Sequence, residues 1–219
     1  MLRVAANSLQ AGAAAVDLRP LVVTMLTRQR TIPAIINSRI TGAVTSVLLI
    51  VGASAVIALA AQIAIPVPLS PVPLTMQPLA VLLVGATLGM RRGAAAAALY
   101  LMEGATGLPV FAQGHGGAIW LMGPTAGYLW SYPFAAALAG WFSERGWGSR
   151  TVRAVAGMFC ALAVIYAGGW AWLAILAGPA AAFKMGIVPF LLADIIKVAF
   201  GAALLPWAER LVGEADAAP

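Results

Sequence analysis

Residues 186–200 read Gly-Ile-Val-Pro-Phe-Leu-Leu-Ala-Asp-Ile-Ile-Lys-Val-Ala-Phe, an apolar run that contains two charges, Asp194 and Lys197. Positions three apart share one face of an α-helix, so the carboxylate and the ammonium point the same way. An ionised group near the centre of a membrane helix costs at least about 2.5–3.5 kcal/mol, and it usually marks a cavity or a polar ligand. Two interpretations follow: a polar binding site, or a structural ion pair that neutralises itself between helices.

The composition of the whole chain is typical of a membrane protein. Of its 219 residues, 62% are hydrophobic and 9% are charged, whereas a soluble domain has about 25% charged residues. The net charge of +6 does not indicate nucleic-acid binding, because the basic residues fall in short segments between apolar stretches. The single cysteine, Cys160, excludes an intramolecular disulfide and a cysteine-based metal site.

We predict an all-α integral membrane protein with six transmembrane helices, each of about 20 residues. The uncharged stretch 40–90 is too long for one helix, and the proline-rich segment 66–73 divides it because proline removes a backbone donor. Residues 104–122 are rich in glycine and are predicted to form a structured loop. The predicted helices are residues 43–65, 75–90, 93–103, 124–141, 154–178 and 186–211.

The distribution of basic residues predicts that both termini are cytoplasmic. With six crossings, the two termini, the turn at 91–92 and the loop at 142–153 lie on one side, and they contain all of the arginines. The loops on the opposite side contain a single basic residue, Lys184. This asymmetry follows the positive-inside rule, and a count of five or seven helices would mix the charges. The loops at 66–74, 104–122 and 178–185 are then extracytoplasmic.

Residues 1–40 are predicted to be a basic extension that precedes the membrane domain at 41–213. They contain five arginines and one acidic residue, with no apolar run long enough for a span or for a clear signal-peptide core. The extension could be a cytoplasmic tail, a surface-lying amphipathic segment, or the product of an early start codon. Met25 is the alternative start in the last case.

The loop 104–117 is a candidate ligand-binding segment. Glycine lets backbone amides approach a ligand closely, and non-helical backbone at membrane depth is tolerated where it lines protein or a water-filled cavity. Gln113 could offer both a donor and an acceptor to an amide or urea group. The alternative is a flexible connector, in which case His115, the only histidine, is a surface loop residue.

Signatures of the common enzyme classes are missing from the sequence. It has no glycine-rich Gly-Lys-Ser/Thr phosphate loop, so the chain cannot itself bind and hydrolyse ATP by that route. It has no Gly-x-Ser-x-Gly elbow, and one histidine cannot build a metal cluster. We therefore predict a binder or transporter without cofactor or metal, not an enzyme.

A more specific pattern is carried by four segments: Pro71–Gln77 (PVPLTMQ), Tyr100–Ala112 (YLMEGATGLPVFA), Gly123–Leu129 (GPTAGYL) and Pro189–Lys197 (PFLLADIIK). In their order and spacing they resemble the BioY family, the biotin-binding S components of energy-coupling factor (ECF) vitamin transporters. The resemblance covers about residues 43–211.

The resemblance implies a six-helix S-component fold in the bacterial cytoplasmic membrane, with biotin held near the extracytoplasmic surface. It implies that Asp194 and Lys197 lie in the biotin site and that the loop 111–117 covers the ligand as a lid. In this lid, Gln113 and His115 stand where glycine, serine or asparagine are more usual. The predicted substrate-binding residues are Asp194, Lys197, Gln113, Phe111, Gly114, Gly117, Tyr128 and Trp120, with Trp172 as a further candidate wall.

Biotin has an apolar bicycle with a polar ureido group at one end and a valerate carboxylate at the other. A site for it needs apolar and aromatic walls with a few convergent polar groups. Lys197 is predicted to be cationic, and Asp194 to accept from a ureido N–H, a loop amide or Lys197 itself. Which end of biotin each residue meets does not follow from the sequence.

The predicted function is high-affinity capture of biotin for uptake, driven by partner ATPases through a transmembrane coupling subunit. The first helix has small residues at four-residue spacing, Ser54 with Ala58 and Ala60 with Ala64, which let helices approach closely in lipid. This face is a candidate docking site for the coupling subunit, and internal contacts within the protein are the alternative. Besides these subunits, the predicted partners are biotin and membrane lipid, and not nucleic acid.

Three alternative functions remain open at this level. The chain could be an S component for another vitamin. It could be an ion-coupled secondary carrier of a small carboxylate with Asp194 titrating; such carriers often have inverted repeats, and the sequence has no convincing internal symmetry. It could also be a membrane scaffold, which predicts no binding of small molecules.

Overall fold

The computed structural model describes residues 42–148 and 150–217, with side chains described as far as residue 206. Within these ranges the chain folds mainly into α-helices, in agreement with the predicted class. The predicted extension at 1–40, with Met25, lies outside the described residues. The helices are α4 (Ala43–Gln62), α5 (Gln77–Leu88), α6 (Met90–Ala105), α7 (Ala126–Glu144), α8 (Thr151–Ala177), α9 (Pro179–Gly186) and α10 (Val188–Ala217).

The longest connections between the helices lie between α4 and α5 and between α6 and α7. The strands β1 (Ala64–Ile65) and β2 (Leu74–Thr75) pair antiparallel, with Ala64 opposite Thr75, and they enclose the proline-rich segment. Two 3-10 helices, η1 (Ala112–Gly114) and η2 (Ala118–Leu121), lie in the loop predicted at 104–122. From residue 106 to residue 122 this loop is structured and not α-helical, as predicted, whereas residues 104 and 105 still belong to α6.

The predicted helix boundaries agree with the observed ones within a few residues, with two differences. The segment 178–185, predicted as a loop, contains α9. Pro179 explains this break and restart, because it cannot donate to the hydrogen-bond ladder of α8 but suits the first position of a new helix. Arg91 and Arg92, predicted to precede a helix, lie in the first turn of α6, which starts at Met90 directly after Gly89 caps α5.

The helices form a bundle in which α7 is central. Helix α7 packs against α5, α6 and α8, while α4 packs mainly against α6 and α10 mainly against α8. Helices α7 and α8 cross where a Cβ on Gly168 would occupy the position of the Ser131 hydroxyl. Glycine at this crossing permits a backbone approach that any side chain would prevent, as is common between helices in lipid.

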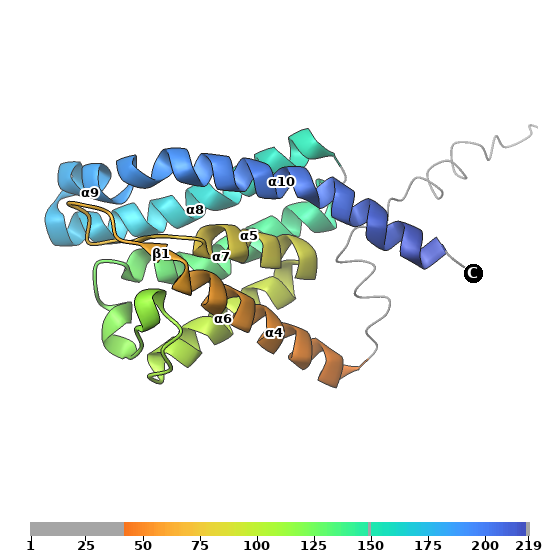
Figure 1. Ribbon diagram of the computed structural model, residues 1–219, viewed down its shortest axis with the longest axis horizontal. Helices are drawn as coiled ribbons and strands as arrows, with labels where there is room; N and C mark the ends of the chain where they lie inside the picture. Colours follow the sequence, from red (N-terminus) through yellow and green to blue (C-terminus); the bar gives the residue numbers. More distant parts are fainter. Residues whose placement is uncertain (1–41, 149, 218–219) are drawn as a thin grey trace, which may run out of the picture.

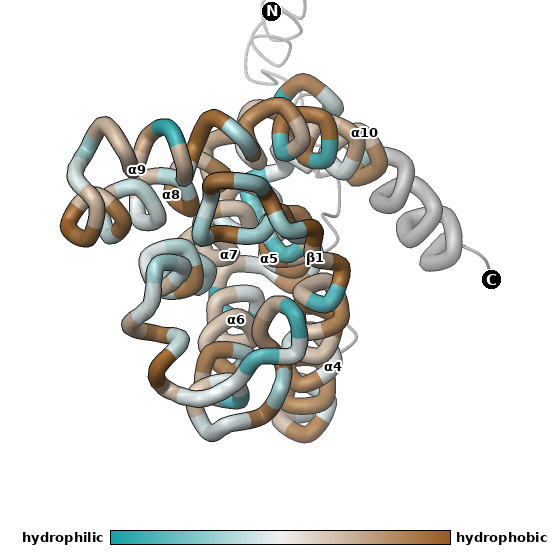
Figure 2. Tube along the Cα trace, turned by 60° about the vertical axis from the view of Figure 1, so that its left-hand side comes forward, coloured by the Kyte–Doolittle hydropathy of each residue, from teal (hydrophilic) through white to brown (hydrophobic). Residues whose placement is uncertain are grey.

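Three of the described helical segments are long and apolar enough to cross a membrane: α4, α8 and the Val188–Pro206 part of α10. Figure 2 shows hydrophobic residues along most of α4. Large apolar side chains such as Leu48 (65% exposed) and Leu59 (69% exposed) face outward from this helix. A continuous apolar surface of this kind is unfavourable in water, and it suits contact with lipid.

Three segments that connect or follow the long helices lie together at one end of the bundle (Figure 1). The segment 66–73, the loop between α6 and α7, and α9 lie at this end, whereas α10 runs towards the opposite end, as does α4 when followed towards its first residue (Figure 1). We call the end that holds the segment 66–73, the α6–α7 loop and α9 the loop end of the bundle. The cavity described next lies there.

Candidate functional site

A cavity of about 190 Å³ opens at the loop end, between the segment 71–78, the loop 111–120 and the helices α7, α8 and α10. Most of its walls are apolar. The aromatic lining residues are Phe111, Trp120, Tyr128, Tyr132, Tyr166 and Phe190, and the polar lining residues are Thr75, Gln77, Gln113, His115, Thr125 and Asp194. An apolar cavity with a few convergent polar groups is the usual form of a small-molecule site.

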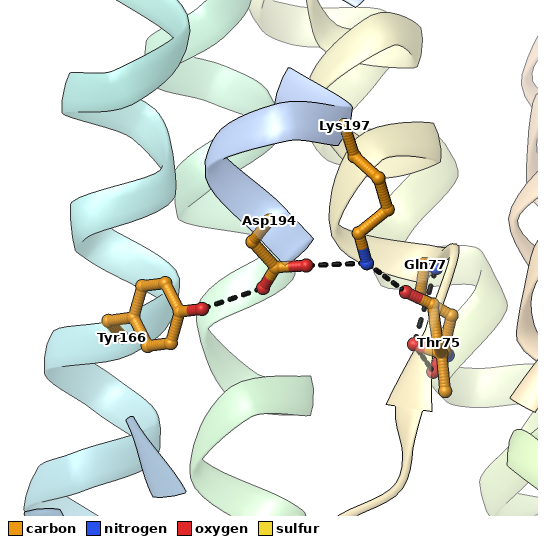
Figure 3. A network of polar contacts seen from close by, with 5 residues as sticks. All are labelled: Thr75, Gln77, Tyr166, Asp194 and Lys197. Carbon is orange, nitrogen blue, oxygen red and sulfur yellow. Dashed lines mark hydrogen bonds and ion pairs between the residues drawn. The ribbon is translucent and has the colours of Figure 1, made fainter. Parts of the chain in front are cut away.

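Asp194 places a buried carboxylate on the cavity wall, with 4% of the residue exposed. The Tyr166 hydroxyl donates to its Oδ2 at 2.7 Å, and the Lys197 ammonium lies 2.5 Å from Oδ1 (Figure 3). Oδ1 makes no further hydrogen bond among the described residues. The possible donors to Asp194 predicted from the sequence are a ureido N–H, a loop amide and Lys197. The structure shows the contact with Lys197 and a second donor, the Tyr166 hydroxyl.

Lys197 itself does not line the cavity. Besides the ion pair, its Nζ donates to the backbone carbonyl oxygen of Thr75 at 2.7 Å, at the end of β2. The Lys197 ammonium therefore pairs with the Asp194 carboxylate from outside the cavity lining. Its bond to Thr75 also links α10 to the strand pair β1–β2. Figure 3 shows this chain of contacts running from Tyr166 on α8 through Asp194 to Thr75.

A second polar group on the cavity wall centres on Gln77, which is 3% exposed at the start of α5. Its Nε2 donates to the Tyr100 hydroxyl oxygen at 2.5 Å, and its Oε1 accepts from the Thr75 hydroxyl at 3.2 Å. Both polar groups of the Gln77 amide are thus engaged with neighbouring side chains. Thr75 consequently belongs to both networks, since its carbonyl oxygen accepts from Lys197 and its hydroxyl donates to Gln77.

The loop 111–117 contributes Phe111, Gln113 and His115 to the cavity. The Phe111 ring meets Tyr100 edge to face, with ring centroids 5.6 Å apart, and it lies where a side chain on Gly104 would have to be. This edge-to-face geometry is favourable because the positive edge of one ring faces the negative face of the other. Phe111 is thereby held as a buried wall on the loop side.

His115 forms a flat polar and aromatic element of the same loop. Its ring stacks on Trp120 with centroids 3.9 Å apart, and its Nδ1 lies 2.7 Å from the Ala112 carbonyl oxygen. His115 therefore lines the cavity, whereas the flexible-connector alternative would make it a surface loop residue. Among the described residues, no group of three or more His, Cys, Asp or Glu could hold a metal ion.

Three further residues of the predicted set lie outside the cavity lining. The Gly114 N–H donates to Gln62 Oε1 at 2.9 Å, and the Gly117 N–H donates to the Gly104 carbonyl oxygen at 2.7 Å. Trp172 donates from its Nε1 to the Gly123 carbonyl oxygen at 2.9 Å. These residues shape the loops and do not form the walls.

Among the polar and aromatic lining residues, sequence reasoning missed Thr75, Gln77, Thr125, Tyr132, Tyr166 and Phe190. Gln77 did leave a signal, because it is a polar residue at the head of an apolar helix, inside the PVPLTMQ segment. The two tyrosines left none, since tyrosine in a membrane helix is commonly an interface anchor. Only the orientation of α7 and α8 brings them to the cavity.

A model of the BioY family matches residues 28–214 of the chain. The chain belongs to the BioY family. The match includes all four of the segments that suggested the resemblance. Family membership and the apolar helices together make this a multi-pass membrane protein.

Several proteins of this family are similar to the chain. "Probable biotin transporter BioY" of Pyrococcus horikoshii is 40% identical over 149 residues, which is 68% of this chain and 86% of the relative. "Biotin transporter BioY" of Rhizobium etli is 38% identical over 143 residues, 61% of this chain and 76% of the relative. The protein of the same name from Thermotoga maritima is 38% identical over 143 residues, 64% and 82% of the two chains.

The fold has a solved counterpart, described as the crystal structure at 2.1 Å of the S-component for biotin from an ECF-type ABC transporter. The two structures align with a TM-score of 0.68 and 22% sequence identity, over 76% of this chain and 92% of the other. This BioY-family chain therefore has the S-component fold.

Proposed function

We propose that this protein captures biotin outside the cell and delivers it across the bacterial cytoplasmic membrane as the S component of an ECF-type ABC transporter. The names of its relatives and the S-component fold support this proposal. The observation that carries it is a buried carboxylate, Asp194, on the wall of an aromatic cavity at the loop end. No cofactor takes part, and the ligand is cargo and not a reactant.

We place the ureido ring of biotin against Asp194. This residue is the only acid on the cavity wall among the described residues, and the Lys197 ammonium is held behind it by Thr75. A carboxylate accepts hydrogen bonds from N–H groups and repels another anion. The two ureido N–H groups are therefore the complementary end of biotin, and Tyr166 completes the network by its bond to Oδ2.

The valerate carboxylate then lies towards the loop 111–117. This loop brings Gln113 to the cavity, and its side-chain amide carries N–H groups that can donate to a carboxylate. His115 lies beside it, with its Nδ1 engaged by the Ala112 carbonyl oxygen. The aromatic walls, Phe111, Trp120 and Tyr128 among them, enclose the apolar bicycle and the valerate chain. In this arrangement the loop closes over the ligand as a lid.

Six crossings by α4, α5, α6, α7, α8 and α10, with α9 at the surface, are the topology that we propose. It places both termini in the cytoplasm and the cavity at the extracytoplasmic side. The support for it is the arginine-rich turns at 91–92 and 145–153, which the positive-inside rule assigns to the cytoplasm. Membrane lipid then surrounds the apolar outer faces.

We propose that the ECF coupling subunit, which links the protein to the ATPase subunits, docks on the outward face of α4. Ser54, predicted as part of that face, is fully buried and donates to Glu103 Oε2 at 2.5 Å. The docking face is therefore placed on the opposite side, where an apolar groove between α4 and α5 is lined by Gly52, Val56 and Leu59. Glycine and exposed aliphatic side chains suit contact with another membrane helix.

The test is biotin binding by calorimetry to the purified, detergent-solubilised protein after removal of carried-over ligand. We expect saturation at about one biotin per chain, and an affinity at least about tenfold weaker in Asp194→Asn, because charge-assisted hydrogen bonds contribute about 1.5–3 kcal/mol. Glu144→Gln is the matched control, since Glu144 bonds the Met90 N–H at 2.8 Å outside the cavity lining. No binding of biotin to well-folded wild type would refute the proposed substrate.

Two biotin analogues test the orientation of the ligand. Methylation of a ureido nitrogen should weaken binding to wild type but add little to the defect of Asp194→Asn, because both changes remove the same hydrogen bond. Conversion of the valerate carboxylate to an amide should weaken binding to wild type and to Asp194→Asn by the same factor. The reverse pattern would place the carboxylate end at Asp194 and overturn the orientation.

A further inference from the structure

The last residue of α4, Gln62, is bonded to the loop 111–117 through its side-chain amide. Its Oε1 accepts from the Gly114 N–H at 2.9 Å. Its Nε2 donates to the Ala58 carbonyl oxygen of α4 at 3.1 Å, and on the loop side to the carbonyl oxygens of Phe111 at 3.2 Å and Val110 at 3.4 Å. An amide that donates and accepts at once pairs with a loop as a strand backbone would.

These bonds bracket the part of the loop that faces the cavity. Phe111 and Gly114 stand on either side of Gln113, whose backbone has a φ of 62°. A non-glycine residue in this left-handed region is held there by its surroundings, because the conformation is unfavourable by itself. In the described part of the chain, Gln62 is the only side chain outside the loop 104–122 that forms a hydrogen bond with residues 110–114.

The helix that carries Gln62 has a second polar tie to the interior. Ser54, eight residues earlier, donates to Glu103 near the end of α6, from which the loop departs. Near the start of α4, Ser46 accepts from Arg92 of α6 at 3.2 Å. The rest of the helix is mainly apolar, and 11% of its apolar stretch is buried. A displacement of α4 relative to α6 therefore acts on the loop directly, through Gln62.

We propose that Gln62 is a positioning residue, which holds the loop 111–117 closed over the cavity and couples the opening of that loop to displacement of α4. This inference rests on the proposed function for the identity of the ligand, biotin, and for the partner on the outward face of α4. It assigns α4 two roles at once, an outward face for a partner and an inward hold on the lid. A partner that moves α4 would thereby open the cavity without touching the ligand.

The first test measures the loop without any ligand. Amide hydrogen exchange of peptides that cover residues 108–118 is followed by mass spectrometry in wild type, Gln62→Leu and Gln62→Glu. We expect exchange about tenfold faster in Gln62→Leu, which corresponds to about 1.4 kcal/mol of lost protection. Gln62→Glu keeps an acceptor for Gly114 but loses the donor to Phe111, and its exchange should be intermediate. Ile63→Ala, at an exposed neighbour of Gln62, is the control and should exchange as wild type.

The second test measures biotin dissociation by stopped flow in the same proteins. We expect Gln62→Leu to release biotin about tenfold faster with a nearly unchanged association rate, because the lid opens more often. A merely destabilised fold would instead lower the number of binding sites and leave the dissociation rate unchanged. Unchanged exchange in Gln62→Leu, or faster exchange with unchanged dissociation, would overturn the inference. Faster exchange in a protein whose wild type binds no biotin would refute the proposed substrate and leave the hold on the loop established.

Discussion

Replacement of Lys197 by methionine removes the cation of a shielded ion pair and leaves its anion in place. The side chains of Lys197 and Asp194 are 16% and 6% exposed, and Tyr166 remains as the hydrogen-bond donor to the carboxylate. One-sided removal of a buried pair typically costs 3–5 kcal/mol. We expect Lys197→Met to lower the free energy of unfolding by about 3 kcal/mol, the low end of that range, because Tyr166 still donates.

The reverse replacement should be milder. Asp194→Asn leaves the ammonium bonded to the Thr75 carbonyl oxygen at 2.7 Å. We expect it to lower the free energy of unfolding by about 1–2 kcal/mol, the range for a lost hydrogen bond. The double variant Asp194→Asn with Lys197→Met removes both charges. It should be within about 1 kcal/mol of wild type, because replacing a whole buried pair is often close to neutral.

The assay is unfolding of the purified protein in mixed micelles by titration with sodium dodecyl sulfate, followed by circular dichroism. Lys184→Met, at the exposed lysine of α9, is the matched control and should stay within about 0.5 kcal/mol of wild type. The decisive quantity is the coupling free energy between the two single replacements. If the double variant is as unstable as the sum of the singles, within about 0.5 kcal/mol, the two charges do not compensate each other and the reasoning fails.

Two further outcomes test the helix crossing and the cavity wall. Gly168→Leu should abolish the folded, monodisperse protein in size-exclusion chromatography, because its side chain would displace Ser131 at the α7–α8 crossing; a normal profile with wild-type melting would contradict that contact. Trp120→Ala should weaken biotin binding by about tenfold in calorimetry, since it removes a wall and the stacking partner of His115; an unchanged affinity would place the ligand away from the loop.

Much of the fold could be predicted from local patterns. The uncharged stretches and the breaks at proline and glycine located the long helices within a few residues, because a membrane span needs a continuous apolar segment. The short helix α9 was missed, since eight residues rich in alanine between two breaks carry no membrane signal. The two-residue strands were missed for a similar reason: a pair so short depends on the closure of its loop more than on its own residues.

For the candidate site, too, contacts within one helix could be predicted from the sequence, and contacts between elements could not. Asp194 and Lys197 could be paired from the sequence, because residues three apart on a helix share a face whatever surrounds them. Their orientation could not, since it depends on the rotation of α10 against its neighbours. The structure turns Asp194 to the cavity and Lys197 to the backbone of Thr75.

By itself, the sequence determined the membrane class, the positions of the main helices, the family and the intrahelical charge pair. Tertiary structure alone decided that Tyr166 donates to Asp194 from 28 residues away, that Lys197 bonds Thr75 across 122 residues, and that Gln62 reaches the loop at Gly114 across 52. The physical reason is that helical geometry fixes neighbours along one helix, whereas contacts between helices depend on how side chains of the whole bundle fit together.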